Sequence, residues 1–112
     1  SSAASNVYKR QLNWVINESG HPEYATVARV RLAGVELDAK DANKAKAVID
    51  AIDPAQAQTP LVLDRRGDVL LALGDVEGAR KCWEDALERD RASGELLALL
   101  SLKIQALPEK KS

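Results

Sequence analysis

Residues that could carry chemistry are few in this chain, and they stand apart in the sequence. There is one histidine and one cysteine. His21 lies between Gly20 and Pro22, where we interpret it as a polar turn residue rather than as a ligand or a pH-sensitive contact. Lys81 beside Cys82 would favour a reactive thiolate, but neighbouring residues of a helix point in different directions and no histidine is near in sequence. We therefore expect a packed, unreactive thiol and no internal disulfide.

Two groups of carboxylates are the nearest approach to a catalytic or metal-binding cluster: Asp38 with Asp41, and Glu84 with Asp85 and Glu88. Metal binding or acid–base chemistry would require them to converge in a pocket with shifted pKa values, whereas carboxylates on a helix surface usually face water. The sequence has no glycine-rich phosphate loop and no zinc-type ligand spacing. We therefore predict no catalytic residue, no metal site and no cofactor, and we expect that the protein is not an enzyme.

Composition and charge limit the class of partner. With 112 residues the chain can form one domain with a modest core. Its 16 basic and 17 acidic residues are interspersed and give a net charge of −1, so it lacks the basic surface that nucleic acid requires. No apolar run approaches the roughly 18 residues of a membrane span. Because the chain has no Met and opens SSAASN, we expect a fragment whose natural N-terminus is missing.

The elements that position these residues are predicted to be short helices, most clearly between Leu63 and Leu87. Gly67 in the middle of a helix costs about 1 kcal/mol relative to Ala, which indicates that another segment approaches closely there. Gly74 ends this helix and Asp75 is placed to cap the next one. The second helix presents Ala79, Trp83 and Ala86 as an apolar stripe. The stretch therefore predicts two helices folded back on each other.

The same unit recurs at a distance of 34 residues. The shift superimposes Ala33 on Gly67, Leu37 on Leu71, Asp41 on Asp75, Ala45 on Ala79 and Ile49 on Trp83. A 34-residue period with small residues at these places is typical of the tetratricopeptide repeat. We therefore predict an all-α fold, a tetratricopeptide-like helical repeat (α-solenoid) of about six antiparallel helices. The predicted repeat-packing residues are Ala33, Ala45, Ile49, Gly67, Gly74, Ala79, Trp83 and Ala86.

The predicted organisation has three parts. Residues 1–22 form an N-terminal helix, interpreted as the half-repeat of a truncated chain, and residues 23–91 form two tetratricopeptide units (23–57 and 58–91). Residues 92–112 form a capping helix, with Ser93 as its N-cap, and a charged tail. The last helix is more apolar than a cap requires, so we expect part of it to contact another molecule. Trp14 lies off the main stripe of the first helix, and either a binding hot spot or a contact with Pro22 or Tyr24 would explain it.

A family resemblance covers most of the chain, about residues 22–107. The stretch LLALGDVEGARKCWEDAL, preceded by LDRRGD and followed by ELLALLSLKIQAL, resembles the periplasmic tetratricopeptide domain of the YfgM-like family of ancillary Sec translocon subunits. The resemblance implies a non-enzymatic domain at the periplasmic face of the bacterial inner membrane, held there by an N-terminal anchor that this chain does not contain. It also implies two protein partners, the Sec translocon and a membrane-anchored chaperone related to prolyl isomerases, which such a subunit would link.

The first helix of each tetratricopeptide unit usually lines a groove, which is the default protein-binding surface. Repeats that hold a C-terminal carboxylate present Lys and Asn there, but Val30 and Asp64 stand at the matching places, which favours an apolar or mixed interface. Carrying the repeat frame over predicts these groove residues: Val27, Val30, Arg31, Gly34, Leu37 and Asp38 from the first unit, and Leu61, Asp64, Arg65, Asp68, Leu71 and Ala72 from the second.

Three alternatives stay open at this stage. Asp64, Arg65 and Asp68 could form only a solvated ion-pair cluster with no role in binding. The domain could also be a generic tetratricopeptide adaptor that binds a short peptide in its concave groove. A third possibility is a structural module that self-associates through its apolar last helix.

Overall fold

The computed structural model describes residues 2–89 and 94–110, and this part of the chain contains six α-helices and no strand. The helices are α1 (Ser2–Glu18), α2 (Pro22–Asp38), α3 (Ala42–Asp50), α4 (Pro60–Ala72), α5 (Val76–Arg89) and α6 (Gly94–Ala106), with a short 3₁₀ turn, η1 (Pro54–Gln56), before α4. The predicted all-α helical repeat is confirmed. Ser93, the predicted cap of the last helix, lies outside the described residues.

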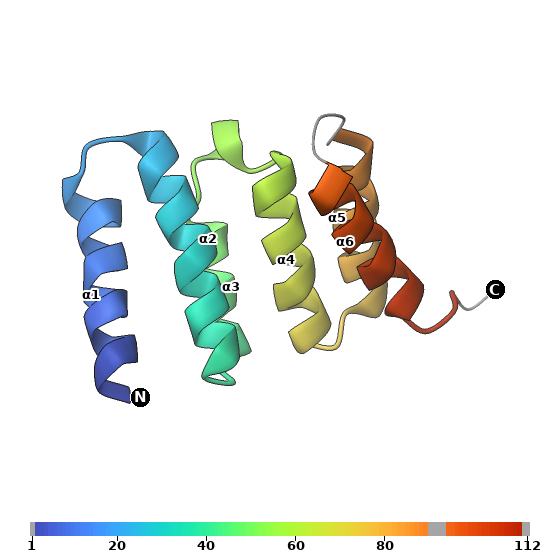
Figure 1. The fold of residues 1–112 in the computed structure, drawn as a ribbon, viewed down its shortest axis with the longest axis horizontal. Coiled ribbons are helices and arrows are strands. Elements are labelled where there is room, and N and C mark those ends of the chain that lie inside the picture. The colour runs from blue at the N-terminus through green and yellow to red at the C-terminus, as the bar shows by residue number, and fades with distance from the viewer. Residues whose placement is uncertain (1, 90–93, 111–112) are drawn as a thin grey trace.

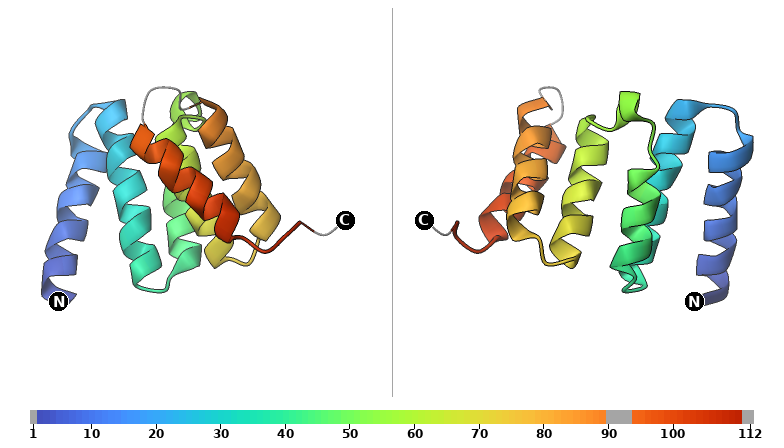
Figure 2. Two further views of the ribbon diagram at one scale, coloured as in Figure 1. Left: turned by 45° about the vertical axis from the view of Figure 1, so that its right-hand side comes forward. Right: turned by 180° about the vertical axis from the view of Figure 1, so that it is seen from behind.

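The helices form an elongated stack of 45 × 29 × 23 Å. Figure 1 shows α1, α2 and α4 side by side, with α3 behind α2 and with α6 in front of α5. The view from behind places α3 and α5 on the opposite face, and the turned view shows α6 lying obliquely across the end of the stack (Figure 2). We call the surface formed by α2, α4 and α6 the front face.

The turns within the two helix pairs repeat each other at the 34-residue spacing. Lys40, after α2, and Gly74, after α4, both have positive φ values, of 64° and 88°. Asp41 then accepts a hydrogen bond from the backbone N–H of Lys44 (3.0 Å), and Asp75 accepts one from Gly78 (2.9 Å). Each carboxylate therefore satisfies a backbone donor at the start of the second helix of its pair.

Buried side chains join the helices in three clusters. Leu12 of α1 packs with Ala28 and Leu32 of α2. A second cluster lies between α2, α3 and α4 and contains Val30, Ala33, Ala45, Ile49, Ile52, Val62 and Val69. A third lies between α4, α5 and α6 and contains Leu63, Ala79, Trp83, Ala86, Leu100 and Leu107. Each helix pair thus shares its core with the next helix, as expected of a stacked repeat.

Gly67 has a direct structural explanation. A Cβ atom on this residue would overlap the indole ring of Trp83. The indole Nε1 donates a hydrogen bond to the backbone carbonyl of Asp64, one turn earlier in α4 (3.0 Å). The missing side chain therefore lets a large aromatic residue lie against the helix backbone, where both its apolar ring and its polar N–H are satisfied.

No helix in the described part of the chain combines the length and apolar character needed to cross a bilayer.

Candidate functional site

The front face carries exposed apolar and charged side chains on rigid helices. On α2, Val27, Arg31, Gly34 and Asp38 follow one another at spacings of three and four residues and so lie on one side of the helix. Val27, Arg31 and Asp38 are exposed. On α4, Leu61 and Leu71 are 44% and 40% exposed. Apolar side chains that remain this exposed on ordered helices offer contact area to a partner.

Val30 does not belong to this exposed surface, and its prediction as a groove residue is wrong. Its side chain is only 4% exposed and lies in the cluster between α2, α3 and α4. The reason is that α4 packs close to α2 at this level, with Val62 and Val69 facing Val30 in the same cluster. Leu37 is partly buried against that cluster too, but it remains accessible at one end of the front face.

Arg65 lies flat between α2 and α4. Its Nε donates to the carbonyl of Val30 (2.9 Å), and its Nη1 contacts Asp68 at 3.1 Å. A Cβ on Gly34 would come within 2.8 Å of the guanidinium, so the absence of a side chain at Gly34 makes room for Arg65. Hydrogen bonds to Val30 and Asp68 therefore hold the Arg65 side chain along the surface between α2 and α4, and it does not project into solvent as a free charge.

Asp64 and Asp68 are bridged by a lysine from the last helix. Lys103 Nζ lies 2.8 Å from a carboxylate oxygen of each. The side chains of Asp64, Asp68 and Lys103 are 16%, 20% and 24% exposed. With Arg65 they form a half-buried ion network, so the ion-pair cluster of Asp64, Arg65 and Asp68 is present but is less exposed to solvent than that alternative supposed. Lys103 was not among the predicted site residues, although it is the single cation within the apolar run LLALLSLKIQAL.

The surroundings of Lys103 favour its charged form. Burial by itself would lower the pKa of Lys103, but the hydrogen bonds and charges of Asp64 and Asp68 outweigh it, and the pKa is raised. The ammonium also lies over the Trp83 ring, 5.5 Å from its centroid, which adds a cation–π attraction. One residue of α6 thus ties together the ion network of the front face and the core of the second helix pair.

A hollow opens at the end of the front face, where α2 turns into α3. It has a volume of about 470 Å³ and is lined by Leu37, Lys40, Ala42, Asp68, Leu71 and Ala72. We call it the α2–α4 notch. Its walls are mostly apolar, with Lys40 and Asp68 as their charged groups. Four of these six residues were predicted to line the groove. Lys40 and Ala42 were not, because they lie at the turn between α2 and α3 and not on the first helix of the unit.

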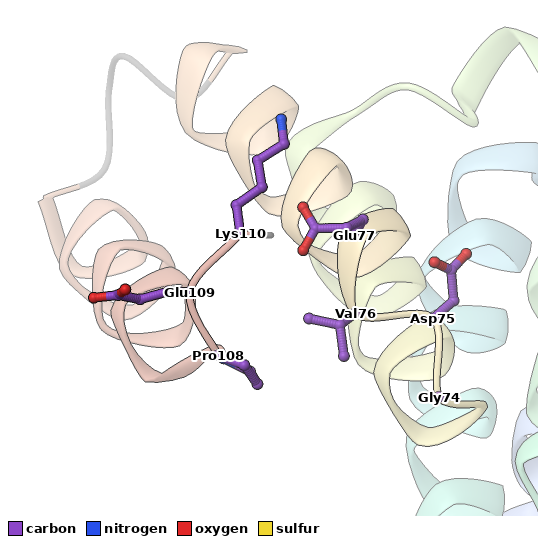
Figure 3. Close-up of a pocket in the computed structure, with 7 residues that line it drawn as sticks. All are labelled: Gly74, Asp75, Val76, Glu77, Pro108, Glu109 and Lys110. Carbon is purple, nitrogen blue, oxygen red and sulfur yellow. The ribbon is translucent and has the colours of Figure 1, made fainter. Parts of the chain in front are cut away.

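A second hollow lies one repeat further along, beside the C-terminal segment (Figure 3). It has a volume of about 520 Å³, and Figure 3 shows Val76 from the start of α5 on one side and Pro108 on the other. Arg80 holds these walls together, because its guanidinium donates to Glu77 (3.0 Å) and to the carbonyl of Pro108. Pro108, which lies just after α6, is therefore held to α5 by a contact within the protein.

Comparison with known proteins assigns the fold to a family. A family model described as a tetratricopeptide repeat-like domain matches residues 3–109. The chain belongs to this family. It is 31% identical over 97 residues, or 87% of its length, to the ancillary SecYEG translocon subunit of Escherichia coli (strain K12). The chain spans about half the length of this curated relative (46%). These matches confirm the resemblance to the YfgM-like family. No solved structure matches the chain significantly.

The repeat-packing positions of this tetratricopeptide repeat-like domain lie where the helices meet. Ala33, Ala45, Ala79 and Ala86 are 0% exposed, and Ile49 and Trp83 are 1% and 2% exposed. Gly67 is also buried, whereas Gly74 is exposed and serves the turn through its positive φ. Small residues therefore stand at the crossings and one large residue fills the space beside them in each unit.

The residues first considered for chemistry are dispersed over the tetratricopeptide repeat-like domain. His21 is exposed, and its ring lies 4.8 Å from that of Tyr24. Trp14 is 61% exposed on α1.

Cys82 is buried, and burial raises the pKa of its thiol, which disfavours the nucleophilic thiolate. Asp85 lies 3.6 Å from Lys81. Within residues 2–89 and 94–110, no three His, Cys, Asp or Glu side chains gather as a metal site would need.

Proposed function

We propose that this tetratricopeptide repeat-like domain is a non-enzymatic protein-interaction module of an ancillary Sec translocon subunit, and that its front face binds the partner. The observation that carries the proposal is the set of exposed apolar side chains on α2 and α4, Val27, Leu61 and Leu71, beside a network in which Asp64, Arg65, Asp68 and Lys103 are paired with one another. The relationship to the E. coli translocon subunit supports the class of partner.

Two finer parts of the proposal rest on the family resemblance. The domain faces the periplasm at the bacterial inner membrane, and it links the translocon to a membrane-anchored chaperone related to prolyl isomerases. The identity to an ancillary translocon subunit supports a site of action at the membrane. The front face and the far ends of the stack are separate surfaces, so one domain of this shape has room for more than one protein partner.

The mechanism is binding by a preformed surface. Arg65, Asp68 and Lys103 hold one another in place before any partner arrives, so little side-chain freedom is lost there on binding. Because Asp64 is the fourth charge of this network and balances it, a partner that covers the network does not leave an unpaired ion in the interface. The exposed leucines around them would supply the apolar area.

A second candidate function is self-association through α6. The specific observation is that Leu99 and Leu102 of this helix are 45% and 63% exposed. Light scattering of the wild-type chain and of Leu102→Glu tests it. A dimer that the substitution converts to a monomer supports self-association, and a monomer in both cases excludes it. Leu100, which is fully buried, is unsuitable for this test because a charge there would disrupt the fold.

Photo-crosslinking in cells tests the main proposal. A photoreactive residue replaces Leu71 or, separately, Leu99 in the full-length protein. The proposal expects capture of a translocon subunit or of the chaperone from position 71. Capture from position 99 alone would move the interface to α6, and recovery of only cytoplasmic proteins from both positions would contradict a role at the translocon.

A further inference from the structure

Lys40 occupies a backbone conformation that lysine rarely adopts. Its φ of 64° lies in the left-handed region, which is costly for residues with a Cβ. The matching residue of the next unit is Gly74, with φ of 88°, which meets the same need without that cost. The turn itself therefore favours glycine, and the lysine side chain is not required for it.

The ammonium of Lys40 has no structural task among the described residues. It forms no hydrogen bond or ion pair with any of them, and the side chain is exposed. Its backbone N–H alone is used, donating to the carbonyl of Leu37 (2.9 Å). The backbone strain at Lys40 and its unpaired ammonium indicate that this side chain serves to bind a ligand and not to stabilise the fold.

The surroundings of Lys40 give that ligand a definite chemistry. Lys40 lines the α2–α4 notch, whose other walls are Leu37, Ala42, Leu71 and Ala72 together with Asp68. Asp68 is already paired with Lys103 at 2.8 Å and with Arg65 at 3.1 Å, so its charge is neutralised within the protein. The notch therefore presents an apolar hollow with one uncompensated positive charge on its wall.

We propose that the α2–α4 notch is the specificity site of the front face and takes an acidic–apolar segment of the partner protein. An apolar side chain of that segment enters between Leu37 and Leu71, and a neighbouring Asp or Glu pairs with Lys40. We assign this carboxylate to a side chain rather than to a C-terminus, because Val30 and Asp64 stand at the places where repeats that hold a C-terminal carboxylate present Lys and Asn. This inference rests on the proposed protein-binding function of the front face.

Selection from a random peptide library displayed on phage tests the inference. The target is the complete chain, with Lys40→Gly as the main variant. This substitution copies Gly74 and removes the left-handed lysine, so we expect a melting temperature equal to or above that of the wild type. The matched control is Arg89→Glu, which changes an exposed charge on α5.

We expect the wild-type chain to enrich peptides with Asp or Glu close to a bulky apolar residue. An enriched peptide, measured by fluorescence anisotropy, should bind about tenfold more weakly to Lys40→Gly, as expected for loss of a charge-assisted contact, and unchanged to Arg89→Glu. Equal binding to Lys40→Gly, enrichment without acidic residues, or loss of binding on amidation of the peptide's C-terminus would each overturn the inference.

The outcomes separate this inference from the proposed function. If Leu61→Arg abolishes binding of a selected peptide but Lys40→Gly does not, the front face remains the binding surface and the α2–α4 notch is not its specificity site. A library that yields no binder would contradict the notch as a peptide site, while photo-crosslinking from position 71 still decides the translocon proposal independently.

Discussion

Trp83 and Gly67 form the contact that closes the second helix pair. The indole lies against the α4 backbone, donates to the Asp64 carbonyl, and receives the Lys103 ammonium over its ring. Sequence spacing located both residues, because a glycine in mid-helix and a large residue at the repeat position are local signals. It could not locate the lysine, which joins the contact from 20 residues later in the chain.

Gly67→Ala should destabilise the protein by about 1–3 kcal/mol, although alanine is the better helix former, because the added methyl group overlaps the Trp83 ring. Urea denaturation followed by circular dichroism measures the change. The control is Gly94→Ala, where a Cβ meets nothing within 4 Å and the stability should change by less than about 0.5 kcal/mol. Equal stability of the two variants would contradict the close packing at Gly67.

Lys103 should stabilise the folded protein at neutral pH and lose this effect at alkaline pH. Its pKa is raised in the folded state, so the native protein binds this proton more tightly than the unfolded chain does. The contribution is then fully present below the unfolded pKa of about 10.4 and is lost as the pH rises through the folded value. Lys103→Met should therefore lower the free energy of unfolding by about 1–2 kcal/mol at neutral pH, between the values for surface and buried pairs.

Urea denaturation of wild type and Lys103→Met at a series of pH values checks this expectation. The difference between the two proteins should narrow above about pH 10. Lys44→Met, at an exposed lysine, serves as the control and should leave stability nearly unchanged. A difference that stays constant through the alkaline range would show that Lys103 acts by packing alone.

At the scale of whole helices, α6 completes the core of the helix pair before it. Leu100 is fully buried and Leu107 is 9% exposed, in the cluster that also holds Leu63 and Trp83. The remaining leucines explain why the helix looked too apolar for a cap: Leu99 and Leu102 face outward. The helix is therefore apolar on two sides, one packed against α4 and α5 and the other exposed.

Leu100→Ala should cost about 2–4 kcal/mol, because it empties a fully buried site, whereas Leu102→Ala should change stability by less than about 0.5 kcal/mol. Thermal denaturation of both variants provides the comparison. If Leu102→Ala were the more damaging of the two, the orientation of α6 in the stack would be wrong.

The helices of the repeat and their order were predictable from the glycine and cap residues at the turns and from the 34-residue period, which can be read from the sequence alone. The side of α2 that faces α4 was not. Val27 and Val30 were both predicted to line the groove, yet Val27 is 39% exposed and Val30 is 4% exposed. Which of these two valines is buried depends on how closely α4 approaches α2, and Gly34 and Arg65 lie at this approach. The hydrogen bond from Arg65 to the Val30 carbonyl joins residues that are 35 positions apart, so no local sequence signal predicts it.

For the molecule as a whole, stacking produces a long face rather than a deep pocket. In a stacked repeat each unit contacts its neighbours, so the exposed surface grows along the stack. The ion network also fits this design, because Asp64, Arg65, Asp68 and Lys103 neutralise one another, while Lys40 lies unpaired beside the apolar walls of the notch. Partner choice would then depend on apolar contacts and on the exposed charges around them.

The most direct test of a protein-binding front face compares Leu71, in the last turn of α4, with Leu73, which caps the C-terminal end of this helix. The two side chains are 40% and 38% exposed, but residues two positions apart on a helical turn point to nearly opposite sides, and only Leu71 lines the α2–α4 notch. Binding of the full-length protein to reconstituted translocon vesicles is measured for Leu71→Arg and Leu73→Arg. We predict at least about a tenfold loss for Leu71→Arg and no loss for Leu73→Arg. Full binding by Leu71→Arg, or loss only with Leu73→Arg, would contradict a binding role for this face.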